Sequence, residues 1–286
     1  MPQICRILAA ALAASCAMAA GATPPGRPSA ANPKVFVETP GYSNPRDAVN
    51  ADVLIQSIMF DDGLSVGPEQ LRYAGQVLEM GYAGPLSAFR VVNGEQATIG
   101  TAGVSYIEVQ DNIPASISIL DRNLFCQRVE NAFANRNLNN RVHLANQAGY
   151  SFVIGFESRI WDSHFDTDQR PEILIFEEQG NSVLTVQALN DALQPVGTPV
   201  EIRAVDIRSI KPNKVWVGRF NNNGDWQPGA YESKLASIDL TALGVQSVKF
   251  LRITTSISSG GEASADLKVV AVDSSPTPAA EPLGFD

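Results

Sequence analysis

The stretch from Gly149 to Gly197 reads GYSFVIGFESRIWDSHFDTDQRPEILIFEEQGNSVLTVQALNDALQPVG, and it decides the fold class. Three short apolar runs lie in it between turns rich in Asp, Asn, Gln and Gly, and no helical stripe interrupts them. The runs at 151–156 and 183–189 alternate, which indicates strands with one packed face and one wet face. The run at 172–176 is apolar after its first residue, which indicates a central strand buried on both faces.

The same pattern continues on both sides of this stretch and predicts a mainly β protein. The other segments are rich in β-branched and aromatic residues and are bounded by Gly, Pro, Asn or Asp. Many short strands joined by turns predict an antiparallel β-sandwich of the jelly-roll type. We expect the further strands at residues 34–38, 52–60, 86–92, 103–109, 200–207, 214–218, 235–240, 248–254 and 266–272.

One or two short helices are expected beside the strands. Residues 68–80 begin with a proline, are followed by a glycine and carry apolar residues at helical spacing. Asp121 is placed to cap a second helix that runs through residues 124–133, with Val129 and Phe133 on its apolar face. Neither segment alternates regularly with strands, so a parallel sheet is not expected.

The first residues predict export. Residues 1–19 combine Arg6, a short Ala-rich apolar run and a small-x-small sequence that ends at Ala19, which is typical of a secretory signal peptide. The run is too short and too Ala-rich to span a bilayer, which takes about 20 strongly apolar residues, so no transmembrane segment is expected in the mature chain. Lipoprotein anchoring through Cys16 is the less favoured alternative. The protein is therefore expected at the cell surface or in the periplasmic or extracellular space.

The rest of the chain divides by composition into a strand-rich middle and two Pro-rich ends. Residues 34–273 are expected to form the β-sandwich, and the alternative of a small N-terminal subdomain at 34–120 stays open. The segments 20–33 and 274–286 are rich in Pro and Ala and are expected to be disordered. Cleavage of the leader leaves Cys126 as the last cysteine, so no internal disulfide supports the fold.

Charge narrows the range of partners. The formal net charge is -9 and no basic stripe is present, which argues against a nucleic-acid partner because no counterion release would favour it. An acidic balance suits an exported protein and the binding of cations.

The segment WDSHFDTDQRPE, residues 161–172, is the first candidate site. Asp166, Asp168 and Glu172, with Asp162 beside them, concentrate carboxylates on one loop, and carboxylate oxygens are the ligands that Ca²⁺ prefers. The sequence thus predicts a calcium site at Asp166, Asp168 and Glu172. The spacing is not that of an EF-hand, and a solvated acidic hairpin loop is the other interpretation.

The segment FNNNGDWQPGAY, residues 220–231, is the second candidate site. Asn222, Asp225 and Trp226 are predicted to bind a glycan, because a flat ring covers the apolar face of a sugar while amide and carboxylate groups take its hydroxyls. The alternative is a tight Asn-Gly-Asp turn with Trp226 folded back on the core.

Catalytic signals are scarce. The sequence contains His143 and His164 as its histidines and carries no G-x-S-x-G, H-E-x-x-H or P-loop motif. We therefore expect a non-catalytic protein. The alternatives are a secreted polysaccharide-acting hydrolase that uses carboxylates such as Glu177 and Glu178, and a structural coat protein that associates with copies of itself.

The order of several segments resembles the exosortase-dependent surface proteins of bacteria. The segments are DVLIQSIMFDDG, SAFRVVNGEQATIG, NRNLNN, SFVIGF and PEILIFEEQGNSVLTVQALNDALQPVG, and the likeness is most specific from Glu172 to Gly197, in E-x-L-x-F-x-E-x-G-N-S-x-L-x-V-Q-A-L. The resemblance implies an exported, sandwich-shaped surface or matrix protein without assigned catalysis, whose partners include polysaccharide or other envelope components. Such proteins normally end in a Pro-Glu-Pro signal, a hydrophobic span and an Arg cluster. Here a Pro-rich spacer with Glu281-Pro282 is followed only by the residues to Asp286, so a freely secreted or periplasmic form is expected.

Overall fold

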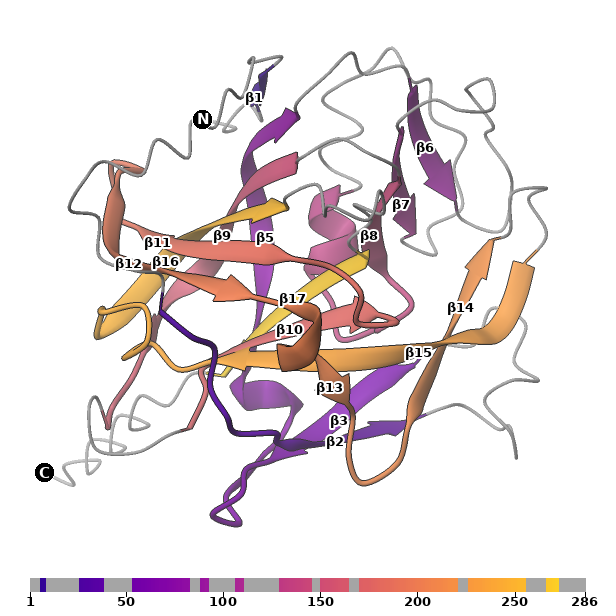
Figure 1. Ribbon diagram of the computed structural model, residues 1–286, viewed down its shortest axis with the longest axis horizontal. Helices are drawn as coiled ribbons and strands as arrows, with labels where there is room; N and C mark the ends of the chain where they lie inside the picture. The colour runs from indigo at the N-terminus through magenta and orange to yellow at the C-terminus, as the bar shows by residue number, and fades with distance from the viewer. Residues whose placement is uncertain are drawn as a thin grey trace, which may run out of the picture.

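The computed structural model describes residues 6–8, 26–38, 53–82, 88–92, 106–110, 129–145, 150–164, 170–220, 226–255 and 266–272. The described chain is mainly β, as predicted (Figure 1). Two short 3-10 helices, η2 (Pro68–Gln70) and η3 (Ala204–Asp206), and a helix at residues 129–133 accompany the strands. The strands are β1 (Arg6–Leu8), β2 (Lys34–Glu38), β3 (Leu54–Met59), β4 (Ser65–Val66), β5 (Leu71–Tyr82), β6 (Ala88–Val92), β7 (Tyr106–Gln110), β8 (Arg141–Ala145), β9 (Tyr150–Trp161), β10 (Ile173–Glu178), β11 (Leu184–Leu189), β12 (Pro195–Ile202), β13 (Arg208–Ser209), β14 (Val215–Phe220), β15 (Trp226–Ile238), β16 (Ser247–Thr255) and β17 (Asp266–Val272).

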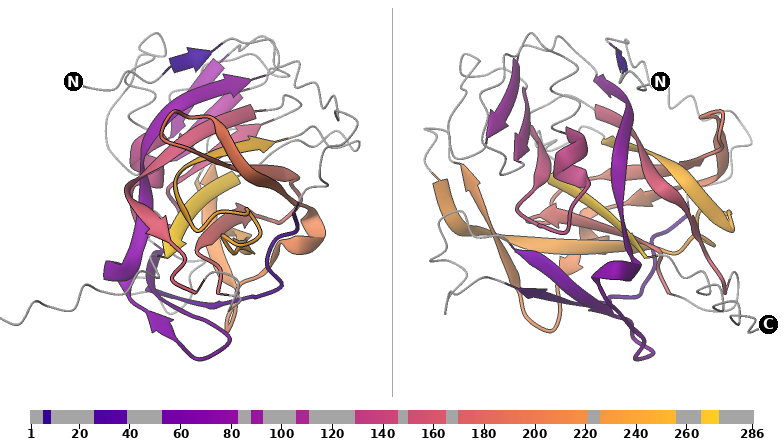
Figure 2. Two further views of the ribbon diagram at one scale, coloured as in Figure 1. Left: turned by 90° about the vertical axis from the view of Figure 1, so that its left-hand side faces the viewer. Right: turned by 180° about the vertical axis from the view of Figure 1, so that it is seen from behind.

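One large sheet dominates the molecule. Its main path runs β12-β11-β16-β9-β5-β17-β10-β15-β13, and a separate sheet of three strands has the order β2-β3-β4. The large sheet is strongly curled, and the small one lies across its lower end (Figures 1 and 2). The pairs along the main path are antiparallel, whereas β1 pairs with β5 and β6 with β7 in parallel. The antiparallel prediction is thus confirmed, and the jelly-roll arrangement of two stacked layers stays a prediction.

Strand β10 lies between the two main hydrophobic clusters. Ile173 and Ile175 belong to one cluster, and Leu174 and Phe176 belong to the other. All six residues of the strand are buried, and β17 and β15 flank it in the sheet. The apolar run at 172–176 is therefore a central strand covered on both faces, as its composition predicted.

The prediction of a helix at residues 68–80 was wrong. The chain forms only one 3-10 turn there and then enters the long strand β5. Leu71, Ala74 and Val77 are buried, a spacing of three that mimics a helical stripe. The pairing of β5 with β9 shifts register between Ala74 and Gln76, and this β-bulge adds a residue, so Ala74 and Val77 lie three positions apart and still pack in the same cluster. Leu71 lies before the bulge and packs in the other cluster, as ordinary alternation over three positions requires.

The second expected helix is described only in its last part. Residues 129–133 are helical, and Val129, Ala132 and Phe133 are fully buried, as the predicted apolar face requires. The Phe133 ring meets Phe152 of β9 edge to face, with centroids 6.3 Å apart. The predicted N-cap, Asp121, and Cys126 lie outside the described residues.

Residues 26–33, which were expected to be disordered, lie against the sheet. The Gly26 N–H donates to Pro199 O of β12 at 2.8 Å, and the Ser29 N–H donates to Ser237 O of β15 at 2.9 Å. This part of the lead-in is held in place by backbone hydrogen bonds, whereas residues 20–25 and the tail 274–286 lie outside the described residues. Within the described part of the chain, no helix has the length and apolar character needed to cross a membrane.

Candidate functional site

Most of the residues predicted to bind ligands lie outside the described part of the chain. Asp166, Asp168, Asn222 and Asp225 lie outside it, so their predicted roles stay predictions. Trp226 begins β15, and only its backbone is described. The remaining predicted residue is Glu172, which is buried immediately before β10.

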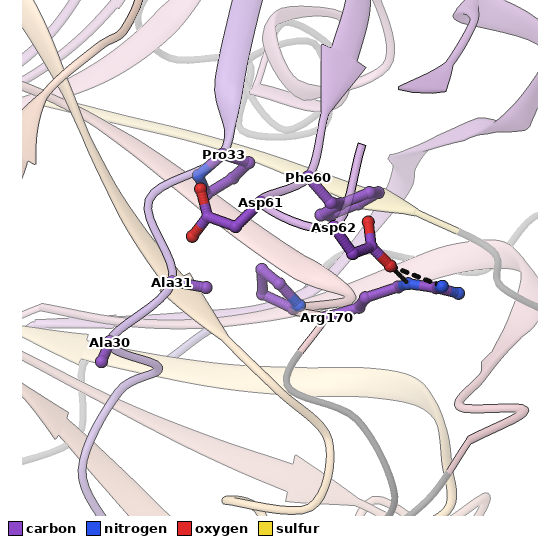
Figure 3. A pocket seen from close by; sticks show the side chains of 8 residues that line it. Ala30, Ala31, Pro33, Phe60, Asp61, Asp62 and Arg170 are labelled. Atoms are coloured by element: carbon purple, nitrogen blue, oxygen red, sulfur yellow. Dashed lines mark hydrogen bonds and ion pairs between the residues drawn. The ribbon is translucent and has the colours of Figure 1, made fainter. Parts of the chain in front are cut away.

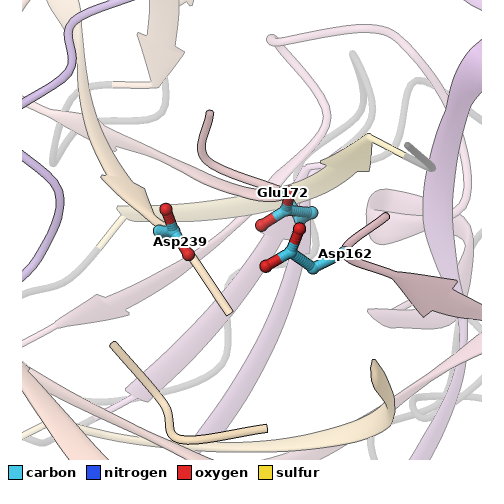
Figure 4. Close-up of side chains that lie close together, drawn as sticks. All are labelled: Asp162, Glu172 and Asp239. Atoms are coloured by element: carbon cyan, nitrogen blue, oxygen red, sulfur yellow. The ribbon is translucent and has the colours of Figure 1, made fainter. Parts of the chain in front are cut away.

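Glu172 belongs to a cluster of three buried carboxylates, which we call the carboxylate cluster. Asp162, Glu172 and Asp239 each offer an oxygen, and the three oxygens lie within 4.8 Å of one another (Figure 4). The register of the sheet explains why Glu172 and Asp239 lie side by side. Ile173 of β10 is paired with Ile238 of β15, so the residues just beyond this pair are brought side by side. Asp162 follows the end of β9 and completes the cluster from a third strand.

Backbone and hydroxyl donors hold the carboxylate cluster. Glu172 Oε2 accepts a hydrogen bond from the Leu240 N–H at 3.1 Å, and Asp239 Oδ1 accepts one from the Thr241 N–H at 2.7 Å. Asp162 Oδ1 accepts from the His164 N–H at 2.8 Å, and the Thr241 hydroxyl lies 3.4 Å from Asp162 Oδ2. The turn after β15 thus contributes one ligand atom and fixes all three carboxylates.

The environment of Glu172 favours its neutral form. The pKa of Glu172 is raised to about 9: burial is the largest cause, the hydrogen bond from the Leu240 N–H opposes it, and the nearby carboxylates of Asp162 and Asp239 add to it. Three carboxylates at this separation cannot all stay ionised without a compensating positive charge. Either a proton on Glu172 or a bound cation relieves the repulsion, and oxygen ligands of this kind suit a hard divalent cation.

Glu172 should make stability depend on pH in metal-free buffer. Its folded pKa of about 9 lies above the unfolded value near 4.5, so its contribution is fully present below pH 4.5 and is lost as pH rises toward 9. Burial similarly raises the pKa of Glu177 to about 8. Each carboxyl lowers the unfolding free energy by about 1.4 kcal/mol per pH unit within its window.

Glu172→Gln removes one of these two titrations. We expect the slope of unfolding free energy against pH, measured by urea denaturation between pH 5 and 8 with a chelator present, to fall by about half. Below about pH 4.5 the variant should be about as stable as the wild type, because the amide matches the shape of the protonated carboxyl. At pH 7 it should be more stable than the wild type by about 3 kcal/mol, because only the wild type gains free energy by ionising this group in its unfolded state. An unchanged slope in the variant would show that Glu172 is already ionised in the folded protein.

The two carboxylates considered for hydrolysis do not face each other. Glu177 and Glu178 are consecutive in β10, so their side chains point to opposite faces of the sheet. Glu177 accepts hydrogen bonds from the Ser182 hydroxyl at 2.7 Å and from the Gly180 N–H. Glu178 pairs with buried Arg141. Both carboxylates therefore serve structural contacts, one at a turn and the other in an ion pair.

His164 also serves a turn. Its Nδ1 lies 2.9 Å from the Ser163 hydroxyl, and both side chains are exposed. Asp162 contacts the backbone N–H of His164, as in an Asx turn, whereas a catalytic triad places the carboxylate on the imidazole ring. For His143 the structure describes the backbone only, in β8.

A cavity of about 280 Å³ has none of the three clustered carboxylates in its lining, although its lining residue Pro171 directly precedes Glu172 (Figure 3). Three segments that are distant in sequence form it: the lead-in, the turn between β3 and β4, and the residues just before β10. Asp62 and Arg170 join two of these walls through an ion pair with a Nη2–Oδ2 distance of 2.5 Å. The lining residues are Ala30, Ala31, Pro33, Phe60, Asp61, Asp62, Arg170 and Pro171.

Sequence reasoning missed Asp239, Asp61 and Asp62 as candidate residues. Asp239 lies 67 positions after Glu172, beyond the end of a strand, so spacing along the chain carries no signal that they meet. Only the register of β10 against β15 brings them together. A turn sequence such as Asp-Asp-Gly is equally common in loops without a site, which is why Asp61 and Asp62 gave no signal either.

Comparisons with known proteins give no information on the carboxylate cluster or on the cavity. A scan against protein-family models, a search of curated proteins and a search of solved structures each found no match.

Proposed function

We propose that the protein is a non-catalytic exported component of the cell surface or extracellular matrix that binds glycan. Export rests on the predicted leader at residues 1–19, and the surface role rests on the resemblance to exosortase-dependent surface proteins. The observation that carries the non-catalytic part is the placement of the buried carboxylates. Among the described residues these are Asp162, Glu172, Glu177, Glu178 and Asp239, and all five lie in a structural contact or in the carboxylate cluster.

A hydrolase is the second candidate function, and the geometry gives it less support. Glycoside hydrolysis takes two carboxyl groups that face each other across one sugar linkage, about 5–10 Å apart. The carboxylates of the cluster are closer than this and buried, and Glu177 and Glu178 point to opposite faces. Neither set leaves room for a sugar ring between an acid and a base.

Binding without cleavage tests this proposal. In pull-downs on a panel of insoluble polysaccharides, the purified mature protein should be retained on at least one of them and should release no reducing sugar. Turnover that is lost on Glu177→Gln or Glu178→Gln would favour the hydrolase instead. Failure to bind any polysaccharide, together with concentration-dependent assembly in sedimentation, would favour a self-associating coat protein.

We further propose that the carboxylate cluster takes up calcium as a structural ion. The support is the convergence of three carboxylate oxygens and the repulsion among them, which a cation would relieve. A calcium ion there would tie the ends of β9 and β15 to the start of β10. It would therefore stabilise the curled sheet and take no part in a reaction.

Calcium should raise the melting temperature of the wild-type protein. A ligand that binds only the folded state adds about 2.7 kcal/mol when its concentration is 100 times its dissociation constant. Asp239→Asn keeps the acceptor for the Thr241 N–H and removes one charge, so this variant should respond much less. Because calcium competes with the proton on Glu172, the shift should also grow between pH 6 and 8. An equal shift in the variant would place any calcium elsewhere.

A further inference from the structure

We propose that the cavity lined by the lead-in, the β3–β4 turn and the segment before β10 binds an amino sugar through its primary ammonium group. This inference rests on the proposed glycan-binding function and names its site and ligand class. The volume of about 280 Å³ is close to the lower end of ligand pockets, which begin at about 300 Å³. A single sugar residue with its substituents is a ligand of that scale.

The walls of the cavity are held before any ligand arrives. The Ser237 hydroxyl donates to Ala31 O at 2.8 Å, which fixes the lead-in on β15. The turn between β3 and β4 is closed by the hydrogen bond from the Phe60 N–H to Leu64 O, also at 2.8 Å. Arg170 is tied to this turn by its ion pair with Asp62. Binding in such a cavity loses little free energy to ordering of the protein.

The charge of the cavity points to a cation. Its charged groups are Asp61, Asp62 and Arg170. Figure 3 shows Asp61 and Asp62 leaving the same turn in different directions, Asp61 toward Pro33 and Asp62 toward Arg170. Arg170 compensates Asp62, whereas no residue in the described part of the chain pairs with the Asp61 carboxylate. The lining side chains therefore carry a net charge of -1, and an ammonium group can pair with the Asp61 carboxylate through a charge-assisted hydrogen bond. The nearby Arg208 guanidinium is held on the opposite wall, where it donates to Ala30 O at 2.7 Å.

The remaining groups favour a sugar over a plain alkylamine. Asp62 and Arg170 present acceptor and donor atoms on one wall, and their side chains are 42% and 28% exposed. A hydrocarbon chain laid against them would remove water without replacing its hydrogen bonds, which costs free energy. The hydroxyls of a sugar replace those bonds. Pro33, Phe60 and Pro171 supply apolar surface for the C–H face of the ring.

This arrangement also selects against the N-acetylated form of the same sugar. Acetylation removes the positive charge and adds a methyl and a carbonyl group. The Asp61 carboxylate would then lose its ionic partner. The proposed site is therefore expected to prefer the charged amino sugar over its neutral N-acetylated form.

The test is calorimetric titration of the full mature chain with chitosan oligosaccharides and with the matching N-acetylated chitin oligosaccharides. Wild-type protein should bind the deacetylated oligosaccharide at least tenfold more tightly. Asp61→Asn should lower that affinity about tenfold, which equals about 1.4 kcal/mol. Asp191→Asn, an exposed aspartate remote in sequence in the turn after β11, is the matched control and should leave the affinity unchanged. Added salt should weaken binding to the wild type more than to the Asp61 variant.

The outcomes separate this inference from the proposed function. Equal affinity of Asp61→Asn and wild type for the deacetylated oligosaccharide overturns the site, and binding of neutral glycans alone overturns the ligand class; both leave glycan binding intact. Binding of n-butylamine as tight as that of glucosamine overturns the sugar specificity. If no saccharide binds at all, the proposed function and this inference fail together. Because Asp61 is exposed, the variant is expected to fold, and a melting curve confirms it.

Discussion

Glu178→Leu is expected to lower the unfolding free energy by about 3–5 kcal/mol, the cost of leaving a buried charge without its partner. The side chains of Arg141 and Glu178 are 5% and 0% exposed, and Arg141 Nη2 lies 2.5 Å from Glu178 Oε2. The same Nη2 donates to Gly218 O at 2.8 Å, whereas Nε and Nη1 of Arg141 have no hydrogen-bond partner within the described ranges of the chain. Among the described residues, Glu178 is the carboxylate that pairs with this guanidinium, and its loss leaves the buried charge without that partner.

Removing both charges should restore much of the loss. In the double variant Arg141→Met with Glu178→Leu, apolar side chains replace the pair, and such replacements are often neutral or stabilising. Urea denaturation of the two single variants and the double variant gives the coupling energy. Asp191→Asn is the exposed control, because Arg159 and Asp191 form a surface pair worth less than about 1 kcal/mol. Additive losses in the double variant would contradict the argument.

Gly197→Ala should be the second most damaging change, with a loss of about 2–5 kcal/mol. Gly197 has a φ of 66°, where an alanine costs about 1–2 kcal/mol. A Cβ there would also lie 1.9 Å from Leu243 O, and such overpacking adds about 1–3 kcal/mol. The contact is tight because the next N–H, that of Thr198, donates to the same oxygen at 2.8 Å.

Gly244→Ala is the matched control for this change. Gly244 has nearly the same φ, 67°, but a Cβ there would find its nearest atoms at 3.6 Å, an ordinary contact. We expect it to lose only the conformational part, about 1–2 kcal/mol. The difference between the two variants in chemical denaturation measures the clash at Leu243. Equal losses would mean that the backbone moves away at little cost.

Periodicity predicted those parts of the fold where the strands are regular. Leu184, Val186 and Ala188 are buried in β11 with partly exposed residues between them, as the alternation required. In strand β5 periodicity gave the wrong prediction, because a bulge places Ala74 and Val77 of one cluster three positions apart and Leu71 of the other cluster lies three positions before them. Nothing local in a sequence distinguishes that spacing from a helix; only the partner strand does.

The candidate site could be predicted only in part, for a related reason. Glu172 was singled out because it ends an acidic loop, and it lies in the carboxylate cluster. Its partner Asp239 comes from another segment, and the pairing of β10 with β15 brings it there. Loop composition therefore identified one member of the cluster, while long-range register supplied another.

The docking of residues 26–33 on the large sheet affects how copies of the protein can associate. Strand β12 is the last one on its side of the large sheet, and Gly26 bonds to Pro199 O and to the Glu201 N–H along it. These bonds occupy donors and acceptors that an uncovered border would offer to a neighbouring chain. The lead-in thus covers part of this edge strand, and its removal would expose the Pro199 carbonyl and the Glu201 N–H to pairing with a second chain.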